Sequence, residues 1–330
     1  MKPFANSAAW LTGYIPDIPT PFDATGAIDL AVFAKLCERQ IRAGVSAIVV
    51  GETAGEFTTL TSAERDAIVR TAADVARGRV RVIAGAGSNS TEEAVERARR
   101  NELTGADALL SVVPYYNKPM QAGIEAHFRA IANSTALPIV LHDIPARTIR
   151  ELADDTLSRL SELPQFVGLK DSTGDLSRTM RLRPTVRSGF ALLTGDDATA
   201  LAYLTSGSDG CISIASNLAP VMCQEIFSNF RQGQMQSAMH LHRRLAPLAA
   251  CVAKENPSAV KYALSLLGLM RPDTRLPLVG LSDQAKAEVA RAIVKIGEND
   301  LKPIIPDEKN ASRAISAPGH AYNSAPGDIS

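Results

Sequence analysis

Short apolar runs alternate along the chain with longer stretches in which apolar residues recur every three or four positions. Several of these runs lack polar alternation, which is typical of strands buried on both faces of a parallel sheet. The pattern predicts eight strands, over Tyr14–Pro19, Ala47–Gly51, Val80–Gly85, Ala108–Val113, Pro138–His142, Phe166–Lys170, Phe190–Thr194 and Gly210–Ile214. Eight strands separated by amphipathic helices predict an α/β fold, a parallel (β/α)8 TIM barrel.

Several of the intervening helices begin with recognisable capping residues. Thr61 and Glu64 have the spacing of a capping box, Ser90 and Glu93 repeat it, and Asp29 precedes an apolar stripe. A doubly wound open sheet is the competing architecture. Its nearest signal is the segment 85–90, Gly-Ala-Gly-Ser-Asn-Ser, which lacks the third glycine of a dinucleotide-binding turn. The barrel is therefore the favoured prediction.

The strand signal stops after about residue 230, and three helical patterns follow, over 234–253, 257–268 and 282–296. The last thirty residues are rich in Pro, Ser, Ala and Gly, which is typical of a disordered tail. We therefore expect three parts: a barrel over 1–232, a C-terminal helical extension over 233–300, and a tail over 301–330.

Charge and cysteine usage narrow the functional classes. Lys and Arg number 35, as do Asp and Glu, so the basic excess expected of a nucleic-acid binder is missing. The four cysteines form neither a CxxC pair nor a zinc spacing, and the five histidines form no HExxH pattern. No signal peptide and no apolar run of membrane-spanning length is visible. These features predict a cytoplasmic protein with no bound metal, no nucleic-acid partner and no membrane partner.

Polar residues follow five of the predicted strands, where parallel barrels carry their active sites. They are Thr53, Glu56, Tyr115, Tyr116, His142, Asp143, Lys170, Asp171, Asp196 and Asp197. Lys170 is singled out because it closes a strongly apolar strand. Alternation would put Phe166, Gly168 and Lys170 on one face, with Gly168 leaving space beneath the long side chain. A sheltered neutral amine can attack a ketone and form an iminium.

Each of these residues also has an ordinary structural explanation. A lysine at a strand end can extend its ammonium group to solvent. An isolated histidine such as His142 is commonly structural, Tyr115 and Tyr116 could be aromatic residues at the barrel rim, and Arg147 could be a surface arginine. Taken singly, none of them identifies a reaction.

Six segments, taken in order, resemble the dihydrodipicolinate synthase / N-acetylneuraminate lyase family of Schiff-base aldolases over about residues 10–300. The spacing is also similar, with Lys170 lying 28 positions after His142. The segments are Pro-Thr-Pro-Phe at 19–22, Thr-Ala-Gly-Glu at 53–56 followed by Thr-Leu-Thr at 59–61, Val-Pro-Tyr-Tyr-Asn-Lys-Pro at 113–119, His-Asp-Ile-Pro-Ala-Arg-Thr at 142–148, Gly-Leu-Lys-Asp-Ser at 168–172, and Leu-Thr-Gly-Asp-Asp at 193–197.

The resemblance implies roles for individual residues. Lys170 would be the nucleophile that forms a Schiff base with pyruvate, so that no separate cofactor is needed. Thr53 and Tyr116 would belong to a hydroxyl relay, with Tyr116 inserted from a neighbouring subunit of a homodimer or homotetramer. Arg147 would bind the carboxylate of the aldehyde acceptor. The remaining substrate-binding positions would be Ala54, Gly195, Ile212 and Thr53, which thus has two roles.

The chain departs from the family pattern at two places near the expected site. Glu52 and Ala54 stand where the family usually has glycine and a second threonine, and His142 stands where the family has a tyrosine that orients the keto acid. Imidazole can also exchange protons near neutral pH, so His142 remains a candidate catalytic residue.

The family's feedback site for lysine is also only partly matched. Asn89, Glu93 and Tyr115 fit it, whereas other residues differ from the usual ones, namely Phe57, Ser62 and Arg65. We expect weak or absent inhibition by lysine.

Three functional hypotheses follow from these observations. The leading one is condensation of pyruvate with aspartate semialdehyde in lysine biosynthesis, through Lys170. The second is an aldolase or dehydratase of the same family that acts on a sugar-derived 2-oxo acid. The third is a binding or regulatory member of the family with little catalytic activity, and it is suggested by His142 and Ala54, which depart from the family pattern.

Overall fold

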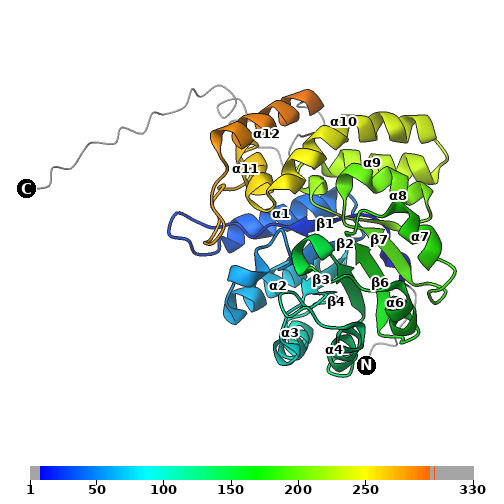
Figure 1. Ribbon diagram of the computed structural model, residues 1–330. Helices are drawn as coiled ribbons and strands as arrows, with labels where there is room; N and C mark the ends of the chain where they lie inside the picture. The colour runs from blue at the N-terminus through cyan, green and yellow to red at the C-terminus, as the bar shows by residue number, and fades with distance from the viewer. Residues whose placement is uncertain (1–7, 298–300, 302–330) are drawn as a thin grey trace, which may run out of the picture.

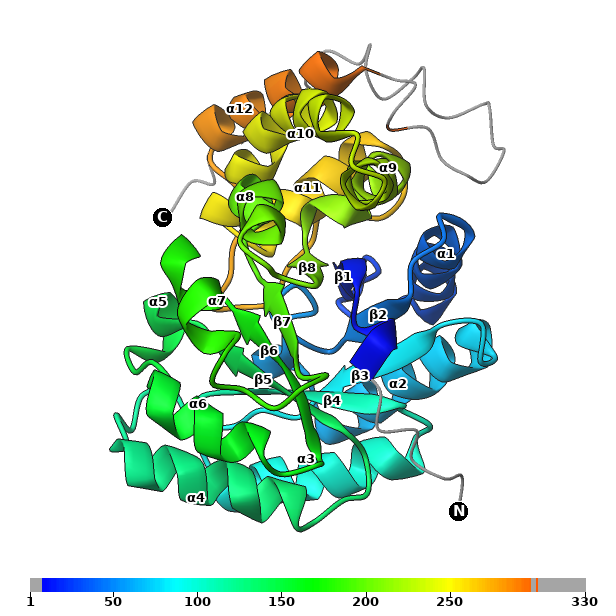
Figure 2. The ribbon, with the colours of Figure 1, turned by 90° about the vertical axis from the view of Figure 1, so that its right-hand side faces the viewer.

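The computed structural model describes residues 8–297 and Leu301, and it contains a closed, all-parallel eight-stranded barrel. Figures 1 and 2 show the strands at the centre and the helices around them. The strands are β1 Gly13–Ile18, β2 Ala47–Val50, β3 Arg81–Gly85, β4 Ala108–Val112, β5 Ile139–Asp143, β6 Phe166–Asp171, β7 Ala191–Thr194 and β8 Gly210–Ser213. Each predicted strand is confirmed within one residue at either end, and the open-sheet alternative is wrong because β1 pairs with β8.

The helices that surround the barrel follow the strands in order, with short 3-10 turns at several loops. The α-helices are α1 Leu30–Arg42, α2 Ser62–Ala76, α3 Thr91–Leu103, α4 Gln121–Ala132, α5 Pro145–Thr148, α6 Asp154–Ser161, α7 Leu176–Leu182, α8 Ala200–Thr205 and α9 Pro220–Arg231. The 3-10 helices are η1 Ala8–Trp10, η2 Phe57–Thr59, η3 Asp197–Thr199 and η4 Ala215–Asn217. Within the described residues, no helix is long and apolar enough to cross a membrane.

The capping residues behave mostly as the sequence predicts. Thr61 and Glu64 form a complete capping box at the start of α2, and Asp29 caps α1 through the backbone N–H of Val32. Ser90 caps α3 by accepting from the Glu93 N–H. The predicted second capping box is nevertheless incomplete, because the Glu93 carboxylate turns away from the Ser90 backbone toward other side chains.

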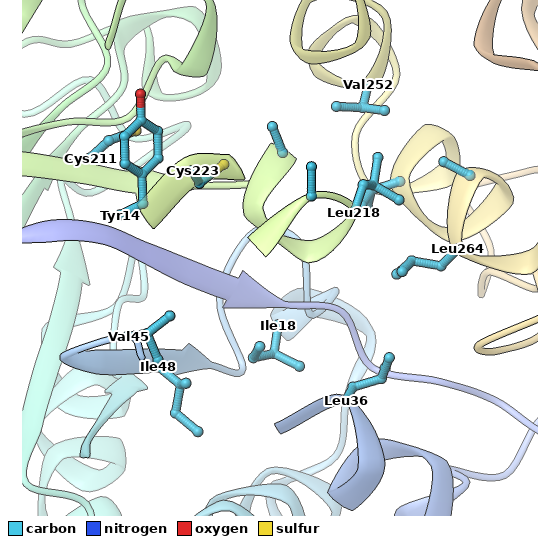
Figure 3. Packing of buried hydrophobic residues seen from close by; sticks show 14 of the residues in the cluster. Tyr14, Ile18, Leu36, Val45, Ile48, Cys211, Leu218, Cys223, Val252 and Leu264 are labelled. Atoms are coloured by element: carbon cyan, nitrogen blue, oxygen red, sulfur yellow. The ribbon is translucent and has the colours of Figure 1, made fainter. Parts of the chain in front are cut away.

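Three further helices form the C-terminal extension: α10 Met235–Lys254, α11 Ser258–Leu266 and α12 Asp283–Ile296. In Figure 1 they lie together beside α9, and α10 packs on both α9 and α12. Figure 3 shows that one apolar cluster is shared, with Ile18 of β1 on one side and Val252 and Leu264 of the extension on the other. The extension is therefore packed onto the barrel by continuous hydrophobic burial. The predicted tail lies outside the described residues, apart from Leu301.

One local irregularity changes which residues of β6 face inward. Ile139 pairs with Phe166, but the next residue, Val140, pairs with Gly168, so Val167 is an extra residue in β6. Such a β-bulge shifts the alternation of side chains. Phe166 consequently packs outward, in the cluster between sheet and helices. The prediction that Phe166 shares a face with Gly168 and Lys170 is wrong for this reason.

Candidate active site

Lys170 lies near the carboxyl end of β6 and is 5% exposed, so the alternative of a lysine that extends into solvent is wrong. Two buried carboxylates face its amine: Nζ lies 3.8 Å from Asp17 Oδ2 and 4.0 Å from Glu52 Oε2. These two residues come from β1 and from the loop after β2. The barrel thus brings one amine and two carboxylates together in an interior shielded from water.

Gly195 provides the room for the lysine side chain. A Cβ atom at this position would lie 3.1 Å from Lys170 Cε and 2.1 Å from Ser172 Oγ. The prediction assigned that role to Gly168, but a Cβ there would instead meet Ala191 and Leu11, which fill the barrel beneath. Gly195 is therefore the glycine that this lysine position requires.

His142 and Glu52 form a buried pair beside Lys170. His142 Nδ1 lies 3.2 Å from Glu52 Oε1, and on the other side of the ring Nε2 lies 3.4 Å from Ser172 Oγ. Burial, together with the positive charge of Lys170, lowers the His142 pKa, so the imidazole is neutral near pH 7. Burial raises the Glu52 pKa, but the positive charge of Lys170 and the hydrogen bonds from His142 and Thr53 act to lower it. Glu52 is thus an anion held by its neighbours.

The loop that follows β2 directs its backbone amides at the protein's own carboxylates. Thr53 donates both its N–H and its hydroxyl to Glu52 Oε2, the latter at 2.5 Å. The Ala54 N–H donates to Asp17 Oδ2 at 3.2 Å. The sequence resemblance assigns Thr53 and Ala54 to substrate binding, and in this structure both amides are already engaged. A substrate carboxylate that uses them must displace Asp17 and Glu52.

Arg147 lies in the wall of a cavity of about 230 Å³ at the mouth of the barrel. Glu52, Thr53 and Tyr115 also line this cavity, and Glu52, whose Oε2 lies 4.0 Å from Lys170 Nζ, connects it to the group of residues around the amine. Arg147 Nη2 donates to the Asn256 carbonyl at 3.0 Å. A guanidinium has further donors with which to bind a carboxylate. The cavity is therefore where a second substrate with a carboxylate could enter.

Two other predicted residues lie apart from this group. Tyr116 is 84% exposed and has a φ of 71°, so within one chain its hydroxyl is not part of the buried site. Ile212 is fully buried in the apolar interior of the barrel, in one cluster with Leu193 and Val140. Ile212 thus forms part of the apolar floor.

Glu56 belongs to the structural frame of the mouth. Its carboxylate forms a buried ion pair with Lys261 of α11 and accepts from the Arg275 N–H at 3.0 Å. Lys261 also donates to the Asp273 carbonyl at 2.9 Å. Burial lowers the Lys261 pKa to about 8, against the opposing effect of Glu56. This pair ties the C-terminal extension to the loop after β2, which carries Thr53.

Sequence reasoning missed Asp17 altogether and recorded Glu52 only as a departure from a motif. A signal for Asp17 was present, because it is a charged residue inside the apolar run Tyr14–Pro19. In a parallel barrel, a charged residue that is buried near the carboxyl end of a strand is a candidate active-site residue.

The closed barrel and the buried amine at the end of the sixth strand define the class of Schiff-base lyases built on a (β/α)8 barrel. The sequence matches the model of the Dihydrodipicolinate synthetase family over residues 10–296, and the chain belongs to this family. A 4-hydroxy-tetrahydrodipicolinate synthase from Hyphomonas neptunium is 44% identical over 290 residues, which are 87% of this chain and 99% of that protein.

Solved structures agree with this assignment. The 4-hydroxy-tetrahydrodipicolinate synthase from Methylacidiphilum fumariolicum SolV is 38% identical, with a TM-score of 0.85 over 87% of this chain and 96% of that one. A chain described as a monomeric dihydrodipicolinate synthase variant is 34% identical, with a TM-score of 0.84 over 87% and 97%. The chain is therefore an enzyme of the Schiff-base lyase class.

Proposed function

We propose that this enzyme catalyses the 4-hydroxy-tetrahydrodipicolinate synthase reaction, in which pyruvate condenses with aspartate semialdehyde. The observation that carries the proposal is the buried amine of Lys170, which lies 4.0 Å from Glu52, a residue of the cavity that has Arg147 in its wall. The amine attacks the ketone of pyruvate, water leaves, and the iminium loses a methyl proton to become an enamine. The enamine then attacks the aldehyde, while Arg147 holds its carboxylate. The covalent intermediate supplies the electron sink, so the reaction uses no cofactor.

His142 takes the position of the family's tyrosine in this proposal. The neutral ring receives support from Glu52 at Nδ1, which leaves Nε2 and the nearby Ser172 hydroxyl to exchange protons with the substrate in the steps that follow Schiff-base formation. Thr53 donates its hydroxyl to the same carboxylate, so it acts through Glu52. Tyr116 would complete the relay only from a neighbouring subunit of a homodimer or homotetramer.

Borohydride trapping tests the nucleophile and the donor substrate together. Wild-type protein incubated with pyruvate and borohydride should gain the mass of one reduced adduct, on the peptide that contains Lys170. Lys170→Ala should gain none and should lose at least about 10³-fold in kcat, because the covalent route is removed. A variant that retains most of its activity would exclude the mechanism. Absence of an adduct on wild-type protein would favour the binding or regulatory alternative.

A panel of acceptors tests the second substrate. Arg147 favours an aldehyde that carries a carboxylate close to the reacting carbon, which fits aspartate semialdehyde better than a sugar-derived acid. Turnover of aspartate semialdehyde and not of sugar-derived 2-oxo acids is the expected result. The reverse pattern would support the aldolase or dehydratase alternative.

The four free cysteines, three of them buried, are in keeping with a reducing compartment, and we propose a cytoplasmic location.

A further inference from the structure

Asp17 is a buried carboxylate beside Lys170 that has no assigned role in the proposed reaction. Its side chain is fully buried, and Oδ2 lies 3.8 Å from Lys170 Nζ while accepting the Ala54 N–H. Oδ1 is buried and has no hydrogen-bond partner among the described residues. A buried carboxylate oxygen without a partner costs free energy. A role in the reaction explains why such a group is kept at this position.

Glu52, the other carboxylate near the amine, is already committed. Its Oε1 binds His142 Nδ1, and its Oε2 accepts both the N–H and the hydroxyl of Thr53. Both oxygens of Glu52 are therefore engaged, whereas in Asp17 Oδ2, at 3.8 Å from Nζ, accepts one hydrogen bond and Oδ1 accepts none from the described part of the chain, so Asp17 has more capacity to take up a proton. Of the two carboxylates, Asp17 is the one suited to exchange protons with the amine.

We propose that Asp17 is the acid–base residue that exchanges protons with Lys170 and with the substrate oxygen while the Schiff base forms. This inference rests on the proposed function, because it requires Lys170 to attack a ketone.

The proton transfers balance with Asp17 alone. Asp17 first takes one proton from the Lys170 ammonium, and the free amine bonds to the ketone carbon while the carbonyl π electrons move to oxygen. Asp17 returns its proton to that oxygen and then takes a second one from the nitrogen, which leaves a neutral carbinolamine. Asp17 finally protonates the hydroxyl, the carbon–oxygen bond breaks, and water departs. An ammonium and a ketone have become an iminium and water, and Asp17 is again a carboxylate.

The surroundings of Asp17 suit it to both directions of transfer. The charged groups that act on it are Lys170 from β6, Glu52 from the loop after β2, and Arg147 from α5. Burial raises the Asp17 pKa to about 7, although Lys170, the Ala54 N–H and Arg147 act to lower it. A group with such a pKa can both accept and donate near neutral pH.

Proton uptake by Asp17 has a second consequence at the same loop. A neutral carboxyl accepts a hydrogen bond more weakly than a carboxylate does. Once Asp17 is protonated, the Ala54 N–H becomes easier to release to the carboxylate of the incoming oxo acid. One proton transfer therefore both frees the amine and opens a binding amide.

Asp17→Asn tests the inference, with two rates measured on the same folded variant. The first is the rate of the borohydride-trapped pyruvate adduct as a function of pH, followed by intact mass. The second is carbamoylation of Lys170 by cyanate without substrate, followed by peptide mass spectrometry, which reports how available the free amine is.

We expect the trapping rate of wild-type protein to rise with pH through about 7. In Asp17→Asn this rise of the trapping rate with pH should be absent, and the trapping rate should fall by about 10²-fold or more. Carbamoylation should be as fast as in wild type or faster, because removing a neighbouring negative charge disfavours the ammonium. If Asp17 acted only through its charge, trapping would accelerate together with carbamoylation, and that result would overturn the inference.

Glu52→Gln is the matched comparison. This substitution removes the other carboxylate near Lys170 Nζ, but the trapping rate should still rise with pH, because Asp17 remains. If Asp17→Asn fails to fold, the wild-type profile still decides, since a trapping rate that is flat around pH 7 contradicts the inference. A wild-type protein that forms no pyruvate adduct overturns the proposed function and the inference together. An adduct in wild type that forms equally well in Asp17→Asn overturns the inference alone.

Discussion

At the scale of single residues, His142 and Glu52 are the two departures from the family pattern of the sequence resemblance that contact one another. His142 replaces a phenol with a neutral imidazole, and Glu52 replaces a glycine with a carboxylate that holds this imidazole. The two changes are linked, because the Nδ1 bond of His142 needs an acceptor at the place where Glu52 lies. The relation between them explains why two departures from the motif can coexist with the same chemistry.

Asp17→Asn should change the pH dependence of stability. The Asp17 pKa is raised from 3.8 to about 7 in the folded protein, so between these values the folded state binds more protons than the unfolded state. The stability linked to this proton is fully present below the lower pKa and is lost as pH rises through the higher one. Asparagine has no such loss. The difference in Tm, variant minus wild type, should therefore be more positive near about pH 8 than near about pH 4. A difference in Tm between variant and wild type that stays constant with pH in thermal melts would contradict this prediction.

At the scale of elements, the loop after β2 is held from two sides. Its amides bind carboxylates of the barrel interior, while Glu56 binds Lys261 of α11 and the Arg275 N–H. The C-terminal extension thereby supports the loop that carries Thr53, although α11 contributes no residue to the group around Lys170. A buried ion pair of this kind holds one packing arrangement, and it is costly to break from one side.

Lys261→Met should lower the free energy of unfolding by about 3–5 kcal/mol, because Glu56 would remain buried without its cation. Lys254→Met is the control, because its pair with Glu288 is 67% and 33% exposed. We expect the control to lose less than about 1 kcal/mol. Urea unfolding of both variants measures the difference. Equal losses would show that the Glu56 pair does not stabilise the mouth.

At the scale of the whole molecule, large apolar side chains are exposed on loops at the carboxyl end of the barrel. Tyr116 is 84% exposed on the loop after β4, and two further large apolar side chains are exposed on the loops after β4 and β5, Met120 at 81% and Ile149 at 64%. Exposed apolar residues close together in the fold often mark an interface. We therefore propose that a second copy of the chain covers this face.

Tyr116→Phe should leave the assembly unchanged but lower kcat by about 10²-fold, because only the hydroxyl of the relay is lost. Light scattering should give the mass of a dimer or tetramer for both proteins. Tyr116→Ala, which removes the ring as well, should lower the mass or weaken assembly. A fully active monomer would exclude the proposed contribution from a neighbouring subunit.

The residues that the sequence resemblance matches to the family's lysine site predict that lysine does not inhibit this enzyme. The Glu93 carboxylate forms a close ion pair with Arg97, lies 3.9 Å from Arg65, and accepts from the Ser88 hydroxyl at 2.9 Å. Phe57 packs edge-on against Tyr115 beside it. Glu93 is thus already neutralised, and an incoming ammonium would have to displace two guanidinium groups.

We expect L-lysine at about 1 mM to leave the initial rate unchanged and to produce no heat of binding in calorimetry. Saturable inhibition in the steady-state assay would show that Glu93 remains available to the amino acid.

By itself, the sequence determined the eight strands, the helices of the extension, and the place of Lys170 at the end of the sixth strand. These follow from local periodicity, since burial on one or both faces leaves its mark on consecutive residues. The tertiary structure decided what surrounds the amine. Ala54 meets Asp17 across 37 positions, His142 meets Glu52 across 90, and the Arg275 N–H meets Glu56 across 219. Such pairings depend on barrel closure and strand register, and the β-bulge at Val167 is set by the pairing of two strands, so no local pattern could reveal them.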